Sequence, residues 1–326
     1  MRAIPQSALV LTLLSSATFA GDLNVSVESA GSNSVTVTPG TTVSYAVVGE
    51  LTDLMNEGLA GVSFDLAFDG GPLPQAAAPA GGNMLHFAPP MGLSNPAGFG
   101  GTSSGGALLQ VGGAQNTFNN VFTPSLLSGT VLTGVAWLGS PETLVTGTVT
   151  APFTPGTYTL SLSNLAANQI RQGETGSGYW AVDEVGVGQV DDLVITVLEV
   201  FSGAPSSISL SAGGSQAWSL DAGVAHAGRG YWVFGSLAGT SPGVPFGSIV
   251  LPVNPDVYFN YTINHPNSGP LMNSLGFLNG IGKATAGFAI PAGTTPSLAG
   301  LTVNHAYALG PLVDFSSNPV ALTFLP

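Results

Sequence analysis

The chain has 326 residues, with 17 Asp and Glu, 4 Lys and Arg, no Cys and a formal charge of −13. Only 6% of its residues are charged, against about 25% in an ordinary soluble domain. The absence of Cys excludes disulfides, Cys-ligated zinc and a lipid-modified N-terminal Cys. The scarcity of Lys and Arg excludes a nucleic-acid-binding surface, which needs clustered cations.

The first 20 residues have the order of regions that is typical of a secretory signal peptide. The start is basic at Arg2, residues 8–14 are apolar and residues 15–20 are mostly small. The apolar stretch is shorter than the ~20 residues that span a bilayer, so it does not predict a membrane anchor. We predict cleavage after Ala20 and a secreted, extracellular protein that begins at Gly21. The alternative is a buried strand at the start of the first domain.

Apolar residues alternate with polar residues in many short stretches, which is the period of a half-buried β-strand. Clusters of Gly, Pro, Asn and Ser separate these stretches. The clearest ones are 43–47, 62–68, 158–162, 193–197 and 284–290. Helical character is modest and confined to residues 51–59, which is enough for two turns at most. The pattern predicts an all-β fold made of antiparallel β-sandwiches.

A turn-rich break at residues 201–205 is the predicted linker between two domains. It follows one alternating stretch and precedes another, and its residues Phe-Ser-Gly-Ala-Pro favour a turn. The first domain is therefore expected at 21–200 and the second at 206–326. Both lengths are ordinary for a domain, so we predict two antiparallel β-sandwich domains in tandem after a signal peptide.

Within the first domain, residues 69–106 are rich in Gly, Pro and Ala and contain no clear strand. Connections of this length are usually either functional or disordered. The segment also carries scattered larger side chains, which favours a segment packed over the sandwich as the cover of a sheet edge. They include Met84, Leu85, His86, Phe87, Met91 and Phe99.

Two stretches near the start of the first domain resemble the opening strands of cohesin-like β-sandwich modules. Residues 38–45 (TPGTTVSY) combine a Pro-Gly turn with an alternating strand, and residues 58–69 (GLAGVSFDLAFD) combine a turn with a strand that ends in Asp. Segments 92–102, 111–117 and 179–183, and the C-terminal half, resemble uncharacterised exported bacterial proteins with a recurrent C-terminal β module. The resemblance implies a sandwich fold and a non-catalytic extracellular role; cohesins bind dockerin modules.

Signatures of hydrolytic chemistry are weak. Two Gly-x-Ser-x-Gly matches place Ser103 and Ser241 at the centre, but a nucleophile elbow needs a strand before it and a helix after it. Neither match has a following helix, and Pro242 suits a turn. Asp65 and Asp69 lie on one strand face without a partner motif for glycosidase chemistry. We therefore predict that the protein is not an enzyme.

Metal-binding spacing is absent among the four His residues, and His305 is expected to be a hydrogen-bonded core residue. Carboxylates gather once, with Gly186 and Gly188 between them. Calcium prefers six to eight oxygen ligands of this kind, so a Ca²⁺ site is one interpretation and a solvated acidic loop is the other. The four residues are Asp183, Glu184, Asp191 and Asp192. No other cofactor is predicted.

Two aromatic pairs provide the other candidate site. Neighbouring rings on a strand point to opposite faces, so one ring of Tyr179-Trp180 and one of Tyr231-Trp232 can face outward and stack on a sugar. The alternative places these rings in the core or beneath a loop. Trp137 and Trp218 are expected in the core.

The sequence therefore favours a non-catalytic structural or protein-interaction module of the cell exterior or extracellular matrix. The second candidate is a carbohydrate-binding protein that uses exposed aromatic residues, and the third is a secreted hydrolase. The expected partner is a protein or a neutral polysaccharide, because the acidic surface repels anionic polymers. Neither nucleic-acid binding nor membrane insertion is expected.

Overall fold

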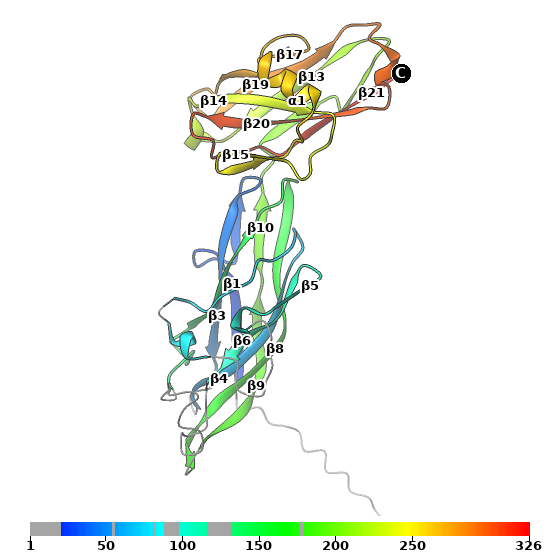
Figure 1. The fold of residues 1–326 in the computed structure, drawn as a ribbon. Helices are drawn as coiled ribbons and strands as arrows, with labels where there is room; N and C mark the ends of the chain where they lie inside the picture. Colours follow the sequence, from blue (N-terminus) through cyan, green and yellow to red (C-terminus); the bar gives the residue numbers. More distant parts are fainter. Residues whose placement is uncertain (1–20, 54–55, 81, 88–97, 116–131, 177–178) are drawn as a thin grey trace, which may run out of the picture.

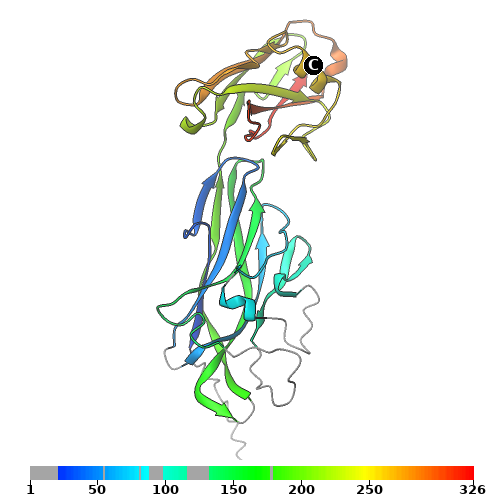
Figure 2. The same cartoon turned by 60° about the vertical axis from the view of Figure 1, so that its left-hand side comes forward.

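A computed structural model of the protein describes residues 21–326 except 54–55, 81, 88–97, 116–131 and 177–178. Two all-β bodies stand end to end in both views (Figures 1 and 2). Each has its own hydrophobic core, which ends at Val197 in the first body and begins at Val200 in the second. The predicted all-β fold with β-sandwich domains in tandem is confirmed.

The first domain is built on a ten-stranded sheet that folds over into two layers. One layer contains β9 (Tyr179–Asp191), β1 (Asp22–Glu28), β3 (Thr42–Leu51) and β7 (Glu142–Thr150), in that order. The other contains β2 (Ser34–Val37), β10 (Leu193–Val197), β8 (Gly156–Gly176), β4 (Asn56–Phe68), β6 (Ala107–Ala114) and β5 (Thr102–Ser104).

Strand β9 belongs to both layers. Its first half pairs antiparallel with β8, and its second half, from Gly186 to Asp191, pairs parallel with β1. Two glycines make this possible, because a Cβ at Gly186 or Gly188 would lie 2.2–2.3 Å from the side chains of Asp22 or Asn24. The long β8–β9 hairpin therefore closes one side of the sandwich.

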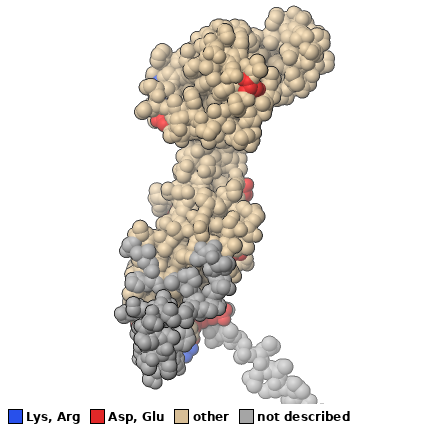
Figure 3. Space-filling model, in the orientation of Figure 1, with Lys and Arg blue, Asp and Glu red and all other residues tan. Residues whose placement is uncertain are grey.

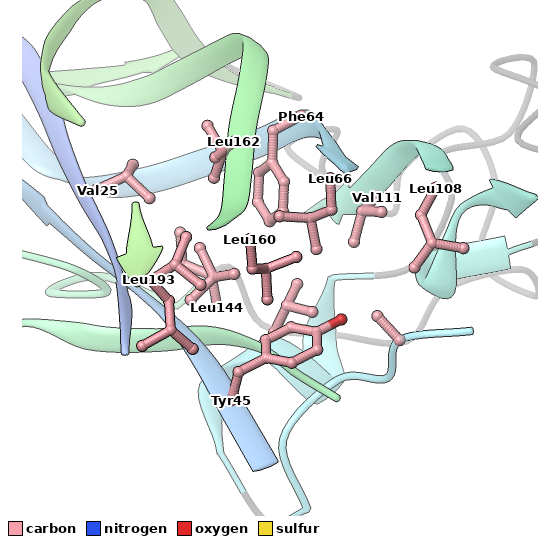
Figure 4. Close-up of a cluster of buried hydrophobic side chains, with 14 of the residues drawn as sticks. Val25, Tyr45, Phe64, Leu66, Leu108, Val111, Leu144, Leu160, Leu162 and Leu193 are labelled. Atoms are coloured by element: carbon pink, nitrogen blue, oxygen red, sulfur yellow. The ribbon is translucent and has the colours of Figure 1, made fainter. Parts of the chain in front are cut away.

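Alternating apolar residues from both layers meet in a single core (Figure 4). Val25 and Tyr45 come from one layer, and Phe64, Leu160 and Leu193 come from the other. Full burial of side chains of this size contributes about 1.5–3 kcal/mol each to folding. The predicted alternating stretches 43–47, 62–68, 158–162 and 193–197 contribute to this core, whereas 284–290 belongs to the second domain.

Tyr45 brings a polar atom into this core. Its hydroxyl oxygen is buried and has no hydrogen-bond partner among the described residues. Burial raises the pKa of Tyr45 to about 12. The ring fits because residue 147 is Gly, where a Cβ would lie 2.4 Å from the hydroxyl oxygen.

We expect Tyr45→Phe to stabilise the first domain by about 1 kcal/mol, because it removes a buried hydroxyl that lacks a partner. Denaturant unfolding measures the change. Tyr231→Phe is the matched control, since the Tyr231 hydroxyl donates to the Asn273 carbonyl oxygen at 2.9 Å and its loss should cost about 1 kcal/mol. A Tyr45→Phe variant less stable than the wild type would contradict this account.

Described residues of segment 69–106 cover the free edge of β7. The Ala77 and Thr146 backbones exchange two hydrogen bonds of 2.9 Å each, which pairs the segment with that edge strand. Leu73, Met84 and Phe87 are buried in the core of the first domain. This agrees with the expected edge cover. The segment includes the short helices η1 (Asn83–His86) and η2 (Gly98–Gly100), whereas Met91 and the side chains of Leu85 and His86 lie outside the described residues.

The second domain consists of two sheets and a covering layer. The first sheet contains β11 (Phe201–Ala204), β13 (Gly214–Asp221), β19 (Lys283–Ile290) and β17 (Leu271–Met272). The second contains β12 (Ser207–Ser209), β21 (Val320–Leu325), β20 (Thr302–Gly310), β14 (Gly230–Ser236) and β18 (Leu275–Phe277). The remaining elements are hairpin β15 (Val244–Phe246) and β16 (Ile249–Leu251), helix α1 (Val257–Asn264), η3 (Val224–His226) and η4 (Pro296–Leu298).

The predicted linker at 201–205 differs from the structure, because Phe201–Ala204 form β11 and pair with β13. Phe201 is fully buried, with its ring 5.4 Å from that of Tyr307 and 5.8 Å from that of Trp218. The connection instead lies at Leu198–Glu199. The Leu198 N–H still donates to the Val37 carbonyl of the first domain, and the Val200 N–H already donates to Asn318 Oδ1 of the second.

The predicted helical character of residues 51–59 is wrong. Strand β3 runs to Leu51, β4 begins at Asn56, and Gly58 has φ +112, which no helix contains. Helix α1 lies elsewhere, at Val257–Asn264. Its N-terminus is capped by Asp256, whose Oδ1 accepts from the Phe259 N–H at 2.6 Å.

Candidate functional site

The two predicted aromatic pairs differ in what the structure describes. Tyr179 and Trp180 form the start of β9, but their side chains lie outside the described residues. Tyr231 and Trp232 lie on β14 and point to opposite faces, as alternation on a strand requires. Tyr231 is buried in the main core of the second domain, where burial raises the pKa of its hydroxyl.

Trp232 does not form an exposed platform. Its ring is partly buried and stacks on Phe234 at 5.2 Å, and its Nε1–H donates to the Thr262 carbonyl of α1 at 3.2 Å. Helix α1 therefore covers the outer face of β14. Both rings of this pair stabilise the fold, in line with the alternative interpretation of a core or covered position.

The four clustered carboxylates do not converge: Asp183, Glu184 and Asp191 lie along β9, and Asp192 follows its last residue. Asp183 and Asp191 are eight residues apart on β9, which corresponds to roughly 26 Å at about 3.3 Å per residue. Asp183 pairs with Arg171, and this bond lowers the pKa of the carboxyl group. Asp192 Oδ1 accepts from the Leu162 N–H at 3.0 Å. Among the described residues no group of three or more His, Asp or Glu side chains is arranged to hold a metal ion.

Neither Gly-x-Ser-x-Gly match is a nucleophile elbow. Ser103 lies on the edge strand β5, and Ser241 lies in a turn before Pro242, with no helix after either residue. Asp65, a candidate for glycosidase chemistry, has a structural role. It accepts from the Gln110 N–H at 2.8 Å and from Asn164 Nδ2 at 2.7 Å. These bonds lie where β4 shifts register against β6 and β8, so Asp65 holds two irregular points of the sheet.

His305 is the core residue that its position on an apolar face predicted. Its Nε2 atom lies 2.9 Å from the Tyr258 hydroxyl, and its ring contacts Trp218 at 4.4 Å. Complete burial lowers the pKa of the imidazole to about 3. The Nδ1 atom has no partner among the described residues. His305 is therefore neutral at ordinary pH and is closed off from solvent.

Trp137 differs from its expected core position. It is 40% exposed, next to the similarly exposed Leu138, in the turn that leads to β7. The backbone of this turn is fixed by the Ser140 N–H, which donates to the Trp137 carbonyl at 2.7 Å, and by the buried Val135 and Ala136. The sequence offered no signal for this, because the turn lies outside the alternating stretches.

The outer face of β9, β1 and β3 carries an open hollow of about 370 Å³. Its lining is polar and acidic and contains no Lys or Arg. The lining residues are Asn24, Val25, Ser26, Glu28, Val48, Gly49, Glu50, Pro141, Gln189 and Asp191. Internal hydrogen bonds order part of this face: the Gln189 N–H donates to Asn24 Oδ1 at 2.8 Å, and Gln189 Nε2 donates to Asp191 Oδ2 at 2.7 Å.

Charge is divided unequally between the domains. Residues 21–200 contain 14 of the 17 acids and one cation, Arg171, whereas the second domain has three acids and two cations. Both of those cations are paired, Arg229 with Asp314 at 2.6 Å and Lys283 with Asp221 at 2.8 Å. The second domain is accordingly almost uncharged on the face shown in Figure 3.

No model of a known protein family matches the sequence, and no curated protein matches it. Among solved structures, cohesin modules are similar to this chain. The sixth cohesin of scaffoldin B from Acetivibrio cellulolyticus, solved with a dockerin, is 13% identical, with a TM-score of 0.33 over 54% of this chain and 99% of that chain.

Two further cohesin structures give similar values. The seventh type I cohesin of ScaB from Pseudobacteroides cellulosolvens is 14% identical, with a TM-score of 0.36 over 54% of this chain and 92% of that chain. The type II cohesin dyad of the adaptor scaffoldin ScaA from Acetivibrio cellulolyticus is 9% identical, with a TM-score of 0.28 over 89% of this chain and 88% of that chain. Separately, the described helices include none with the length and apolar character of a membrane span.

Proposed function

We propose that the chain is a non-catalytic, exported module that binds another protein at the cell exterior or in the extracellular matrix. The observation that carries this proposal is that polar side chains which could serve catalysis instead stabilise the fold. Asp65, Asp183 and Asp192 hold strands together, and His305 is closed off in a core. The outer face of β9, β1 and β3, in contrast, is open and hollowed.

The charge of this face indicates the chemistry of the partner. Glu28, Glu50 and Asp191 line the hollow, and the first domain has a single cation, which is paired with Asp183 on another part of β9. A partner that presents Lys or Arg is therefore attracted, and an anionic polymer is repelled. Attraction of this kind weakens as salt screens the charges.

The test starts from a partner isolated by cross-linking residues 21–326 to the exported proteins of the host, followed by affinity measurements with the purified pair. We expect the double variant Glu28→Gln, Asp191→Asn to weaken binding about tenfold at low salt, and less at high salt. Glu184→Gln is the matched control, because it removes an exposed acid from the β8-paired half of β9.

Two outcomes count against the proposal. If the purified partner binds the double variant as tightly as the wild type, this face is not the interaction surface. If the protein turns over ester, peptide or glycoside substrates and Ser103→Ala or Ser241→Ala abolishes that turnover, the chain is an enzyme.

Export itself has a direct test. We expect the exported protein to begin Gly21-Asp-Leu-Asn, because cleavage after Ala20 leaves the whole of β1 intact. The position also suits the fold, since the Gly21 carbonyl already accepts from the Gly186 N–H at 2.8 Å. N-terminal sequencing of protein from the medium provides the measurement, and an intact Met1 in that fraction would disprove export by cleavage.

A further inference from the structure

The second domain has an open groove of about 480 Å³, within the size range of small-molecule sites. It lies between the outer face of the β13–β19 pair and the segment that contains β18. Its lining residues are Ser219, Tyr231, Asn273, Leu275, Gly276, Phe277, Asn279, Lys283, Ala284 and Thr285. The structure describes the whole of this domain, so the lining is complete.

One side of the groove is an exposed aromatic ring. Phe277 is 79% exposed, and Leu275, two residues earlier on β18, is 41% exposed. The strand beneath them is fixed, because it pairs with β14 from Gly230 to Trp232 and rests on Tyr231. Gly276 permits this, since a Cβ there would lie 2.8 Å from the Tyr231 hydroxyl oxygen. The ring is thus presented on a rigid support and has no internal packing role.

The other side of the groove is polar and has no net charge. Ser219 and Thr285 are cross-strand partners of β13 and β19 on the same outer face. Their hydroxyls and the side-chain amide of Asn273 have no hydrogen-bond partner among the described residues, whereas Asn279 Oδ1 accepts from the Ile281 and Lys283 N–H groups. The Lys283 amine is neutralised by Asp221 at 2.8 Å. The groove therefore offers hydrogen-bonding groups without net charge.

The edge of β18 is closed to strand addition at its first residue, Leu275. The Leu275 N–H donates to Asn267 Oδ1 at 3.0 Å, and Asn267 Nδ2 donates to the Leu275 carbonyl at 2.9 Å. This side chain occupies the positions that an added strand would need. An added strand is therefore disfavoured at this end of β18, which favours a ligand that contacts side chains.

We propose that this groove binds a neutral carbohydrate chain. The apolar face of one sugar ring stacks on Phe277, and the sugar hydroxyls bond to Ser219, Thr285 and Asn273. The site is independent of the protein-binding face proposed for the first domain. It also differs from the aromatic pairs predicted from the sequence, because Tyr231 serves only as its floor.

The test is native affinity electrophoresis of residues 21–326 in gels that contain hydroxyethyl cellulose, xyloglucan or galactomannan, each of which is neutral. We expect at least one polysaccharide to retard the wild type. Phe277→Ala should weaken that binding about tenfold without loss of folding, because the ring is exposed. Phe277→Trp should retain it, and the double variant Ser219→Ala, Thr285→Ala should weaken it several-fold.

The matched control is Val257→Ala, which shortens an apolar side chain that is 88% exposed at the start of α1 and should leave retardation unchanged. The proposal fails if no polysaccharide retards the wild type, or if Phe277→Ala is retarded as strongly as the wild type. It also fails if Phe277→Ala disrupts binding of the isolated protein partner while no polysaccharide binds, since the groove would then be a protein site.

Discussion

Replacement of Asn318 by Ala is expected to lower the free energy of unfolding of the second domain by about 3 kcal/mol or more. Asn318 is buried and its side chain makes three hydrogen bonds to the first residues of this domain. Its Oδ1 accepts from the Val200 and Phe201 N–H groups, both at 3.0 Å, and its Nδ2 donates to the Phe201 carbonyl at 2.7 Å. It therefore replaces the strand that is missing beside β11.

The large effect arises because Ala leaves these backbone groups buried without partners, and each such group costs about 1–3 kcal/mol. Calorimetry of the two-domain chain measures the change, with the transition of the first domain as an internal reference. Asn264→Ala is the control, because that exposed side chain donates only to the Asn260 carbonyl within α1. A second domain as stable in Asn318→Ala as in the wild type would show that water replaces the lost bonds.

Acid is expected to destabilise the second domain through His305. Burial holds the pKa of the folded imidazole at about 3, against 6.5 for the free side chain. The folded state thus favours the neutral ring, and its contribution is complete above pH 6.5 and lost as the pH falls towards 3. One proton taken up on unfolding removes up to about 1.4 kcal/mol per pH unit, or roughly 2–3 kcal/mol between pH 6.5 and 4.5.

The surroundings of His305 offer no charge that would offset this loss. Tyr258 of α1, Trp218 of β13 and Phe288 of β19 contact the ring, and no acid is among these contacts. The His305→Gln variant should flatten the acid limb of a plot of unfolding free energy against pH. Asn264→Ala should leave the limb unchanged, because that exposed side chain has no titratable group. The same slope in His305→Gln and wild type would rule His305 out as its source.

The strands were predictable wherever one face of a strand is buried. Val43, Tyr45 and Val47, and Phe64 and Leu66, alternate with polar neighbours because only one side of β3 or β4 meets the core. Helical character was predicted for residues 51–59 because they contain Leu, Met and Glu at spacings that suit a helix. Gly58 decides against a helix there, since its positive φ is a property of the folded backbone.

Helix α1 was missed because its residues, VYFNYTIN, are weak helix formers. Tertiary packing stabilises it, through the buried Phe259 and Thr262 and the cap at Asp256. Because the helix was not predicted, the sequence left open whether Trp232 faces outward or is covered, and α1 covers its ring. Likewise, the four acids at and just after β9 are near in sequence, but an extended strand spreads its side chains over its whole length.

The candidate groove depends on contacts that no sequence pattern reveals. Phe277 stands between Gly276 and Leu278 in a short strand, where an aromatic residue is usually assigned to a core. Its exposure follows from the pairing of β18 with β14 and from the capping of Leu275 by Asn267. Ser219 and Thr285 come together only because β13 and β19 pair in that register.

The short linker between the domains determines whether the two proposed sites can bind their targets at the same time. Glu199 alone lies between the last backbone bond of the first domain and the first bond of the second. Long flexible tethers let two modules search many separations, whereas a tether of this length presents them at nearly one spacing. A surface with its protein and sugar targets at that spacing would be held with strong avidity. A surface whose targets are spaced differently would engage only one of the two sites. Binding strength would therefore depend on the distance between the two targets.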